Sequence, residues 1–373
     1  MRGMTGATLT CDVVVIGLGP AGASAARAAA KAGARVIGLD KRVRPGEPVQ
    51  CAEFVPLSLS SEVDRLADLA VQPIEAMATF TEGDGPRRDP LPGWIVDRAR
   101  FDRTLVERAA AAGVDCRFAA PVGTVDVDGV SLSDGTRVVA PVIVGADGPR
   151  SAVGRAIGSV NRILSHTRQI TVPLLVPHLA TDIFLSKTMP GGYGWLFPKG
   201  GVANLGLGVD APARGFLRVL LEGLRAGLVR EGRIGWDVLA TTGGLIPAGG
   251  LLPPVGRLGT RDVLLAGDAC GLTNPVTGAG IASAVISGRM AGEAAAARIA
   301  GDASAPADYA DELSDLFGSA LARAARRRAE LVAACAANRA GPAELERAWI
   351  AFEDYWTAPL DDVEEPTTSG VAA

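Results

Sequence analysis

The sequence predicts an α/β protein in which a parallel-sheet nucleotide-binding domain is interrupted by an inserted antiparallel sheet and followed by C-terminal helices. Two glycine-rich segments, one towards each end of the chain, and a change in hydrophobic periodicity between about residues 165 and 255 lead to this prediction. The chain has 373 residues, of which 48% are apolar, so it can bury one large core or two smaller ones.

The N-terminal segment has the pattern of one complete β-α-β unit. Residues 12–16 form a continuous apolar run, which is typical of a buried parallel strand. An alanine-rich helix is predicted over residues 21–32, and a second strand over residues 34–39 leads to Asp40. This order of elements predicts a Rossmann-like domain.

The turn of this unit carries a G-x-G-x-x-G spacing. We expect Gly17 to permit the tight turn, Gly19 to let the backbone approach a pyrophosphate, and Gly22 to let helix and strand pack closely. Asp40 lies about twenty residues further on, where it can accept a hydrogen bond from a ribose hydroxyl. The predicted cofactor-binding residues here are Gly17, Gly19, Pro20, Ala21, Gly22, Asp40 and Lys41.

The second glycine-rich segment begins with an apolar strand that ends at Gly267 and Asp268. Paired with the first segment, it implies an FAD lying between the two. An alanine-rich helix is predicted over residues 281–299, and the backbone amides at its start would point at flavin N1 and O2, where negative charge collects on reduction. The predicted cofactor-binding residues here are Gly267, Asp268, Pro275, Gly278, Ala279, Gly280 and Ile281.

The remaining elements divide the chain into parts. A polar helix is expected at 60–70, an amphipathic helix at 96–113, a β-meander with turns at 128–129 and 134–135, a buried strand at 142–148, successive antiparallel strands at 169–176, 182–187, 193–198 and 202–209, and a helix at 216–230. We therefore predict a discontinuous FAD-binding domain (10–75, 95–160, 255–300), a substrate domain (165–255 with about 76–94), a C-terminal helical region (305–356) and a disordered tail (357–373).

At this point the chain resembles the glutathione-reductase-type FAD proteins, in the branch shared by p-hydroxybenzoate hydroxylase and geranylgeranyl reductase. Asp147-Gly148, followed by Arg155, matches the Asp-Gly motif of that branch, which helps to hold FAD and can touch a nicotinamide donor. Gly267-Asp268 matches its Gly-Asp motif. Arg98, in a V-x-R-x-x-F context, matches an arginine that contacts FAD. The resemblance thus implies that Arg98, Asp147 and Gly148 also bind the cofactor.

The segment from Pro190 to Pro198 matches the P-x-x-Y-x-W-x-F-P signature of geranylgeranyl reductases at every fixed position. On a strand, Tyr193, Trp195 and Phe197 would project from one face. That face could line an apolar slot for a long hydrocarbon above the flavin, or it could be the core face of the sheet. The match makes Tyr193 and Trp195 candidate catalytic residues on the substrate side.

Cys51 is a third candidate catalytic residue. It lies in the loop Pro48–Glu53, where geranylgeranyl reductases have a C-G-E segment near the flavin. Here Ala52 replaces the middle glycine of that segment, a departure from the family pattern. The alternative is a buried loop cysteine without a chemical role.

Composition excludes several classes of protein. A net charge of −4 without a lysine tract argues against nucleic acid as a partner. The five scattered cysteines predict neither a disulfide framework nor a metal site, and a reduced cytoplasmic location is the default. No apolar run has the roughly 18 residues needed to span a membrane. The basic run Arg323–Arg328 is interpreted as a solvated helix face, with contact to an anionic membrane surface as the alternative.

The predicted function is that of an FAD-dependent oxidoreductase resembling geranylgeranyl reductase. Hydride would pass from reduced flavin N5 to a carbon–carbon double bond of a prenyl or other apolar substrate, with NAD(P)H or reduced ferredoxin as electron donor. The alternative is a monooxygenase that hydroxylates an aromatic small molecule, or a peptidyl tryptophan or phenol, through C4a-hydroperoxyflavin. A halogenase is disfavoured because no W-x-W-x-I-P run occurs. A flavin- or lipid-binding chaperone is the non-enzyme alternative.

Overall fold

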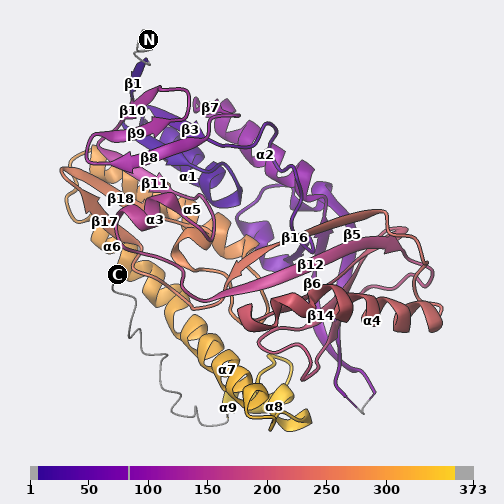
Figure 1. Ribbon diagram of the computed structural model, residues 1–373. Helices are drawn as coiled ribbons and strands as arrows, with labels where there is room; N and C mark the ends of the chain where they lie inside the picture. The colour runs from indigo at the N-terminus through magenta and orange to yellow at the C-terminus, as the bar shows by residue number, and fades with distance from the viewer. Residues whose placement is uncertain (1–6, 83–84, 358–373) are drawn as a thin grey trace, which may run out of the picture.

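The computed structural model describes residues 7–82 and 85–357, and this part of the chain forms three β-sheets in two regions (Figure 1). The predicted disordered tail lies almost wholly in residues 358–373, outside the described residues. Within the described ranges, no helix is both long and apolar enough to cross a bilayer.

The first region is built on a six-stranded sheet of order β17-β18-β11-β2-β3-β7. All neighbouring strands are parallel except for β17, which pairs antiparallel with β18. The strands are β2 (Val13–Ile16), β3 (Val36–Leu39), β7 (Asp115–Arg117), β11 (Val142–Gly145), β17 (Val255–Leu258) and β18 (Arg261–Leu265). The predicted β-α-β unit is confirmed, with α1 (Pro20–Lys31) between β2 and β3.

Two helices that are far apart in sequence lie side by side against this sheet. They are α1 and α5 (Ile281–Ile299), and the bounds of α5 are those predicted. A Cβ on Gly288 would lie 2.1 Å from the Ala21 carbonyl oxygen, so a larger residue there would separate the helices. Because α1 follows β2 and α5 follows β18 by way of a loop, both helices open at the carboxyl edge of the sheet.

A four-stranded sheet of order β1-β10-β9-β8 flanks this region. It contains β8 (Val122–Asp126), β9 (Gly129–Leu132) and β10 (Arg137–Val139), which confirms the predicted meander. A short strand, β1 (Thr8–Thr10), adds a parallel partner to β10. The predicted amphipathic helix is α2 (Arg98–Ala111), which begins after Asp97, whose carboxylate caps the Arg100 amide at 3.0 Å. A short helix, α3 (Ala152–Ala156), follows β11.

The second region is an eight-stranded sheet of order β16-β12-β15-β14-β13-β5-β6-β4. Its strands are β4 (Phe54–Pro56), β5 (Ala70–Phe80), β6 (Arg87–Val96), β12 (Leu164–Pro173), β13 (Ala180–Phe184), β14 (Gly194–Lys199), β15 (Val202–Val209) and β16 (Ala240–Pro247). The expected hairpin between β14 and β15 is confirmed. The prediction that these strands pair antiparallel in sequence order is wrong for β12 and β13. Strand β12 lies between β15 and β16, and β13 pairs parallel with β5.

The predicted polar helix at 60–70 is also wrong. Two single 3₁₀ turns, Leu57–Ser61 and Leu66–Leu69, stand in its place, with Arg65 in the left-handed conformation between them at φ 55°. The reason is that Leu59, Leu66 and Leu69 are buried, and Ala70 already pairs with Val96 at the start of β5. Tertiary burial of these apolar residues therefore decides the conformation against local helix propensity.

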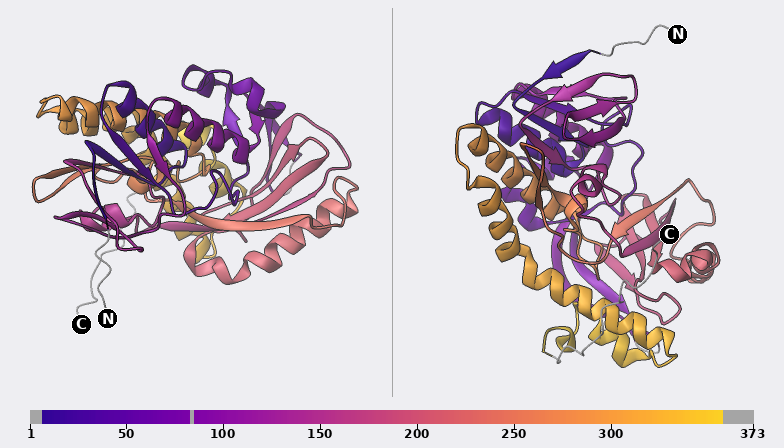
Figure 2. Two further views of the ribbon diagram at one scale, coloured as in Figure 1. Left: turned by 90° about the horizontal axis from the view of Figure 1, so that it is seen from above. Right: turned by 60° about the vertical axis from the view of Figure 1, so that its left-hand side comes forward.

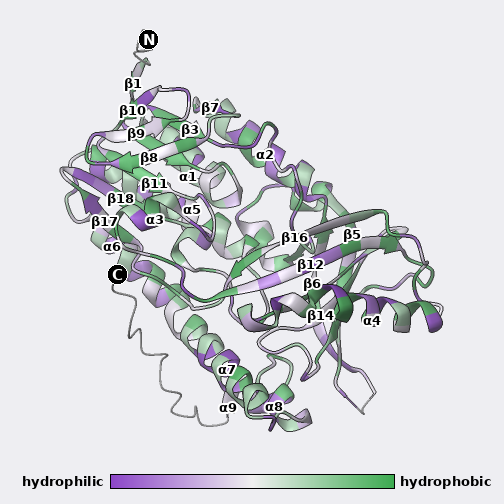
Figure 3. Cartoon of the chain, viewed as in Figure 1, coloured by the Kyte–Doolittle hydropathy of each residue, from purple (hydrophilic) through white to green (hydrophobic). Residues whose placement is uncertain are grey.

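The C-terminal helices run from the first region along the side of the second (Figure 1; Figure 2). They are α6 (Ala305–Leu313), a π-helical turn (Ser314–Gly318), α7 (Ser319–Ala336), α8 (Pro342–Arg347) and α9 (Glu353–Thr357). Along α7, which carries both hydrophobic and hydrophilic residues (Figure 3), buried residues such as Leu321, Ala324, Arg328 and Leu331 recur every three or four positions, as expected for a helix packed on one side. A further helix, α4 (Leu217–Arg230), packs on β12 and β15 of the eight-stranded sheet. The division of the chain into an FAD-binding and a substrate domain remains our proposal.

Candidate active site

The first glycine-rich turn lies between the end of β2 and the start of α1. Gly17 has φ +89°, and a Cβ there would lie 2.3 Å from the Ala146 carbonyl oxygen. A Cβ on Gly22 would lie 1.7 Å from the Gly17 oxygen. No side chain caps α1 and no acidic residue occupies its first turn. The open amides at this helix end therefore suit a diphosphate, and binding of the cofactor by Gly17 to Gly22 stays a prediction.

Asp40 lies at the end of β3, and its carboxylate is hydrogen-bonded to the glycine-rich turn. Its carboxylate accepts hydrogen bonds from the Leu18 amide at 2.8 Å and from the Arg42 amide and guanidinium at 2.8–3.1 Å. Burial opposes the charge of Asp40, but the Arg42 hydrogen bonds and charge outweigh it and lower the pKa of Asp40. A ribose hydroxyl would therefore share this carboxylate with Arg42, a residue that the sequence analysis missed. The neighbouring Lys41 is exposed.

The Asp-Gly segment after β11 has a local structural role. The Asp147 carboxylate accepts hydrogen bonds from the Ser151 hydroxyl at 2.5 Å and from the Ala152 amide at 2.6 Å, and so caps α3. Gly148 follows in the left-handed conformation at φ +85°. The Asp147 carboxylate thus holds the turn before α3, and binding of a cofactor by Asp147 and Gly148 stays a prediction.

The second glycine-rich segment places Asp268 directly after β18, in a 3₁₀ turn at Gly267–Cys270. Its Oδ1 accepts a hydrogen bond from the Thr273 hydroxyl at 2.6 Å. Burial raises the pKa of Asp268, against the opposing effects of the Thr273 hydrogen bond and the Arg98 charge. The loop from Pro275 then leads into α5, which has no side-chain cap and no acid in its first turn. Pro275, Gly278, Ala279, Gly280 and Ile281 thus form a second uncapped helix start.

Arg98 lies close enough to Asp268 for their charges to interact. The start of α2 is therefore near the second glycine-rich segment. Its guanidinium donates hydrogen bonds to the Asp102 carboxylate at 3.0 and 3.2 Å. Burial disfavours the guanidinium charge, but Asp102 and the adjacent Cys51 thiol outweigh burial and raise the pKa of Arg98. Arg98 therefore lies close to both Asp268 and Cys51.

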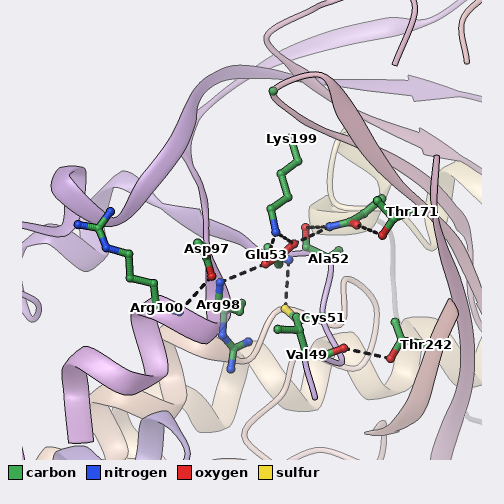
Figure 4. A network of polar contacts seen from close by, with 12 residues as sticks. Val49, Cys51, Ala52, Glu53, Asp97, Arg98, Arg100, Thr171, Lys199 and Thr242 are labelled. Carbon is green, nitrogen blue, oxygen red and sulfur yellow. Dashed lines mark hydrogen bonds and ion pairs between the residues drawn. The ribbon is translucent and has the colours of Figure 1, made fainter. Parts of the chain in front are cut away.

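A buried carboxylate next to Cys51 ties three elements together (Figure 4). Glu53 is 2% exposed and accepts hydrogen bonds from the Lys199 ammonium at 2.7 and 2.8 Å, from Asn204 Nδ2 at 2.8 Å and from the Arg98 amide at 3.1 Å. The Glu53 amide donates to the Cys51 sulfur at 3.1 Å. Glu53 also holds a left-handed backbone, with φ 75°, which is unusual for a residue with a side chain. The network fixes the Cys51 loop against α2 and the β14–β15 hairpin.

The sequence analysis quoted Glu53 but missed Lys199 and Asn204. The sequence pattern that could have pointed to Lys199 is its position directly after the aromatic motif, next to the hairpin glycines. A charged residue at that turn looks like an ordinary exposed lysine. Only the fold shows that its ammonium lies on a buried carboxylate.

The aromatic strand β14 faces the Cys51 loop. Trp195 is 7% exposed, and its Nε1 donates to Gln169 Oε1 at 3.0 Å. Gln169 in turn donates from Nε2 to the Cys51 carbonyl oxygen at 3.0 Å. The Tyr193 hydroxyl donates to the carbonyl oxygen of Thr277, in the loop before α5. Burial raises the pKa of Tyr193, so its hydroxyl stays protonated at neutral pH. The strand is thereby joined to both sides of the expected flavin site.

Trp195 and Phe197 lie on one face of β14, and Tyr193 immediately precedes the strand. The interpretation of this face as core is confirmed for Trp195 and Phe197, while its use as a slot for a hydrocarbon stays a prediction. Trp195 and Phe197 belong to a buried cluster that includes residues of α7 and α8. A small cavity remains between this cluster and the loop before α5, lined mainly by apolar groups that include Tyr193, Val276 and Trp349. The face is thus mostly core, with one apolar opening beside Tyr193.

The basic run on α7 departs from its predicted exposure. Arg327 is fully buried and Arg328 is 5% exposed. Arg328 donates to the Gly191 carbonyl oxygen at 3.0 Å and to Asp210 at 2.7 Å. For these two residues the interpretation as a solvated helix face is wrong. Arg328 joins α7 to the rest of the protein, and Arg327 joins α7 to α9 through the Tyr355 carbonyl oxygen at 3.2 Å.

Comparisons with known proteins show which family the chain resembles. A family model described as the geranylgeranyl reductase catalytic domain matches residues 167–215. Digeranylgeranylglycerophospholipid reductase of Thermoplasma volcanium is 32% identical over 310 residues, which cover 75% of this chain and 76% of the relative. A geranylgeranyl bacteriochlorophyll reductase-like protein of Thermoplasma acidophilum superposes with a TM-score of 0.79 at 27% identity, covering 87% of this chain and 88% of that one.

A probable FAD-dependent monooxygenase from Pseudomonas aeruginosa also superposes, with a TM-score of 0.67 at 20% identity over 87% of this chain and 97% of that one. This likeness shows that the fold is shared with monooxygenases.

Proposed function

The chain belongs to the geranylgeranyl reductase family of FAD-dependent oxidoreductases, and we propose that it reduces carbon–carbon double bonds in the prenyl chains of a lipid. The observation that carries the proposal is the attachment of the aromatic strand to the loop before α5. Tyr193 donates to the Thr277 carbonyl oxygen, and Tyr193 and Val276 both line the small apolar cavity. An apolar chain that entered there would lie beside the loop that is expected to hold the flavin ring.

The predicted cofactor residues fit FAD. Two uncapped helix starts, those of α1 and α5, offer backbone amides to negatively charged groups, and two acids, Asp40 and Asp268, offer hydroxyl partners. Bound and reduced, FAD supplies a hydride to one carbon of the double bond. The protein must then exclude water, orient the chain and hold a proton for the neighbouring carbon.

The three candidate catalytic residues are proposed to divide these tasks. Tyr193 and Trp195 each donate their polar hydrogen to a protein acceptor, so they form a wall of fixed position for the prenyl chain. The Cys51 sulfur accepts a hydrogen bond from the Glu53 amide and lies beside the Arg98 guanidinium. Cys51 is the one of the three whose hydrogen has no protein acceptor among the described residues. We therefore propose the Cys51 thiol as the proton donor.

The test is a single turnover without oxygen. The FAD-loaded protein, reduced with dithionite and freed of excess reductant, is mixed with a lipid that carries geranylgeranyl chains. The expected result is reoxidation of the flavin with addition of two hydrogens per double bond by mass. The same lipid with fully saturated chains is the control and should leave the flavin reduced. Absence of reoxidation with every prenyl lipid would contradict the proposal.

The monooxygenase alternative has only the shared fold in its favour. It predicts oxygen consumption and an oxygenated product, both of which the same experiment repeated in air would detect. The electron donor stays a proposal, with NAD(P)H and reduced ferredoxin as candidates, and an anaerobic titration with each would decide between them. A cytoplasmic location with peripheral contact to a membrane is proposed from the lipid substrate.

A further inference from the structure

Two side chains of the eight-stranded sheet bind carbonyl oxygens of the loop that carries Cys51. Thr242, on β16, donates from its hydroxyl to the Val49 carbonyl oxygen at 3.1 Å (Figure 4). Gln169, on β12, is 5% exposed and donates from Nε2 to the carbonyl oxygen of Cys51 itself at 3.0 Å. Gln169 also accepts a hydrogen bond from Trp195 Nε1 at 3.0 Å. Of these two side chains, Gln169 is therefore the one that connects the loop to the aromatic strand.

The partners of Gln169 dictate the chemistry of its side chain. An indole N–H can only donate a hydrogen bond, and a carbonyl oxygen can only accept one. Oε1 must therefore face Trp195 and Nε2 must face Cys51, as they do in the structure. An ionised carboxylate at this position would satisfy Trp195 and repel the Cys51 carbonyl oxygen, and an apolar side chain would satisfy neither. Among these three kinds of side chain, only the amide satisfies both partners.

We propose that Gln169 is a positioning residue that fixes the Cys51 thiol relative to Trp195. The inference rests on the proposed function and deepens it, because one side chain then holds both the proton donor and the aromatic wall for the prenyl chain. The backbone of Cys51 is held through its carbonyl oxygen, and its sulfur accepts the Glu53 amide at 3.1 Å. Proton transfer depends steeply on the distance and direction between donor and acceptor, so a fixed thiol increases its rate.

The test is the single-turnover reoxidation of the reduced, FAD-loaded protein without oxygen, at a series of concentrations of a lipid with geranylgeranyl chains. The first variant is Gln169→Glu, which keeps the length of the side chain. Its ionised form cannot donate to Cys51, whereas its protonated form has one O–H and can replace both hydrogen bonds. Burial next to a carbonyl oxygen should raise the pKa of this carboxyl above the ordinary glutamate value.

The second variant is Gln169→Met, which keeps the length and has no hydrogen-bond donor. Because it is uncharged, it decides the question even if a buried carboxylate prevents Gln169→Glu from folding. Gln72→Glu is the matched control. Gln72, on β5, accepts from the Gly200 amide at 2.8 Å and donates to the His178 carbonyl oxygen at 3.2 Å, so it makes the same pair of bonds without bonding to Cys51 or Trp195.

At pH 8 we expect the rate constant at saturating lipid to fall about tenfold in both variants at position 169. The half-saturating lipid concentration should change by less than about twofold, because the apolar contacts that bind the chain are kept. Between pH 8 and pH 5, the ratio of the Gln169→Glu rate to the unmodified rate should rise towards one, while the ratio for Gln169→Met stays low. Taking the ratio cancels the titration of Cys51, Glu53 and Lys199, which is common to all the proteins.

A Gln169→Met rate equal to that of the unmodified protein would overturn the inference. So would a loss confined to the half-saturating concentration, a Gln169→Glu ratio that does not change with pH, or an equal loss of rate in Gln72→Glu. Each of these outcomes leaves the proposed function standing. If no prenyl lipid reoxidised the unmodified protein, the proposed function would fall, and the inference with it.

Discussion

The ion pair between Glu53 and Lys199 allows a sharp test of how the site is held together. The change is Lys199→Met, which keeps the aliphatic length of the side chain and removes its ammonium. Glu53 would keep hydrogen bonds from Asn204 and the Arg98 amide, but its carboxylate, 3% exposed, would lose its only ion-pair partner among the described residues. Leaving one charge of a buried pair uncompensated costs about 3–5 kcal/mol.

The expected loss is smaller here because the Lys199 side chain is 25% exposed, so water already screens part of the attraction. We expect Lys199→Met to lower the free energy of unfolding by about 2–3 kcal/mol. The double variant Glu53→Gln with Lys199→Met removes both charges and should be more stable than Lys199→Met alone. A coupling of about 1–2 kcal/mol between the two positions is expected.

The assay is urea unfolding of the FAD-loaded protein, followed by the fluorescence of its tryptophans, of which Trp195 is buried near this network. Lys187→Met is the matched control, because Lys187 is exposed and should tolerate the change. The reasoning is refuted if Lys199→Met unfolds like the control, or if the double variant loses as much stability as the two single variants together. Either result would mean that the pair contributes no net stabilisation to the loop.

Two further predictions concern charges outside this network. Arg42→Met should weaken FAD binding in equilibrium dialysis severalfold while leaving the fold intact, because Asp40 would lose the guanidinium that holds its carboxylate in place; unchanged binding would show that Arg42 plays no part in the cofactor site. His178→Gln should destabilise the protein more at pH 5 than at pH 9. The Asp182 hydrogen bond raises the pKa of His178, so its stabilisation is present below the unfolded value near 6.5 and is lost as the pH rises through the folded value. Thermal melts at the two pH values measure this, and equal losses would contradict it.

Much of the fold follows from local pattern. The β-α-β unit, the helix at 281–299 and the hairpin at 194–209 were predictable because each depends on residues close together in sequence. Apolar runs, glycine turns and alanine-rich segments specify them. The strand at 169–176 was found but displaced, since β12 spans Leu164–Pro173. Local pattern is least informative about where a strand ends.

The candidate site, like the fold, has some features that local pattern predicts and others that only the fold reveals. The glycine turns, Asp40, Asp268 and the aromatic motif were visible because their chemistry lies in short spacings. Arg42 and Lys199 were not, because each acts through a partner that the fold selects. Two arginines of the basic run on α7 looked solvated and are buried, since nothing in their spacing predicts that Arg327 donates to the Tyr355 carbonyl oxygen and Arg328 to Asp210.

The sequence alone therefore determined that this protein has a dinucleotide-type glycine turn, a second glycine-rich segment and an aromatic strand motif. The tertiary structure decided which groups meet around them. Glu53 and Lys199 are 146 positions apart in the chain, and the pairing of β5 with β13 brings together segments about a hundred residues apart. Such contacts are fixed by the burial of whole faces and by the need to satisfy buried charges. Those are properties of the packed molecule and of no single segment.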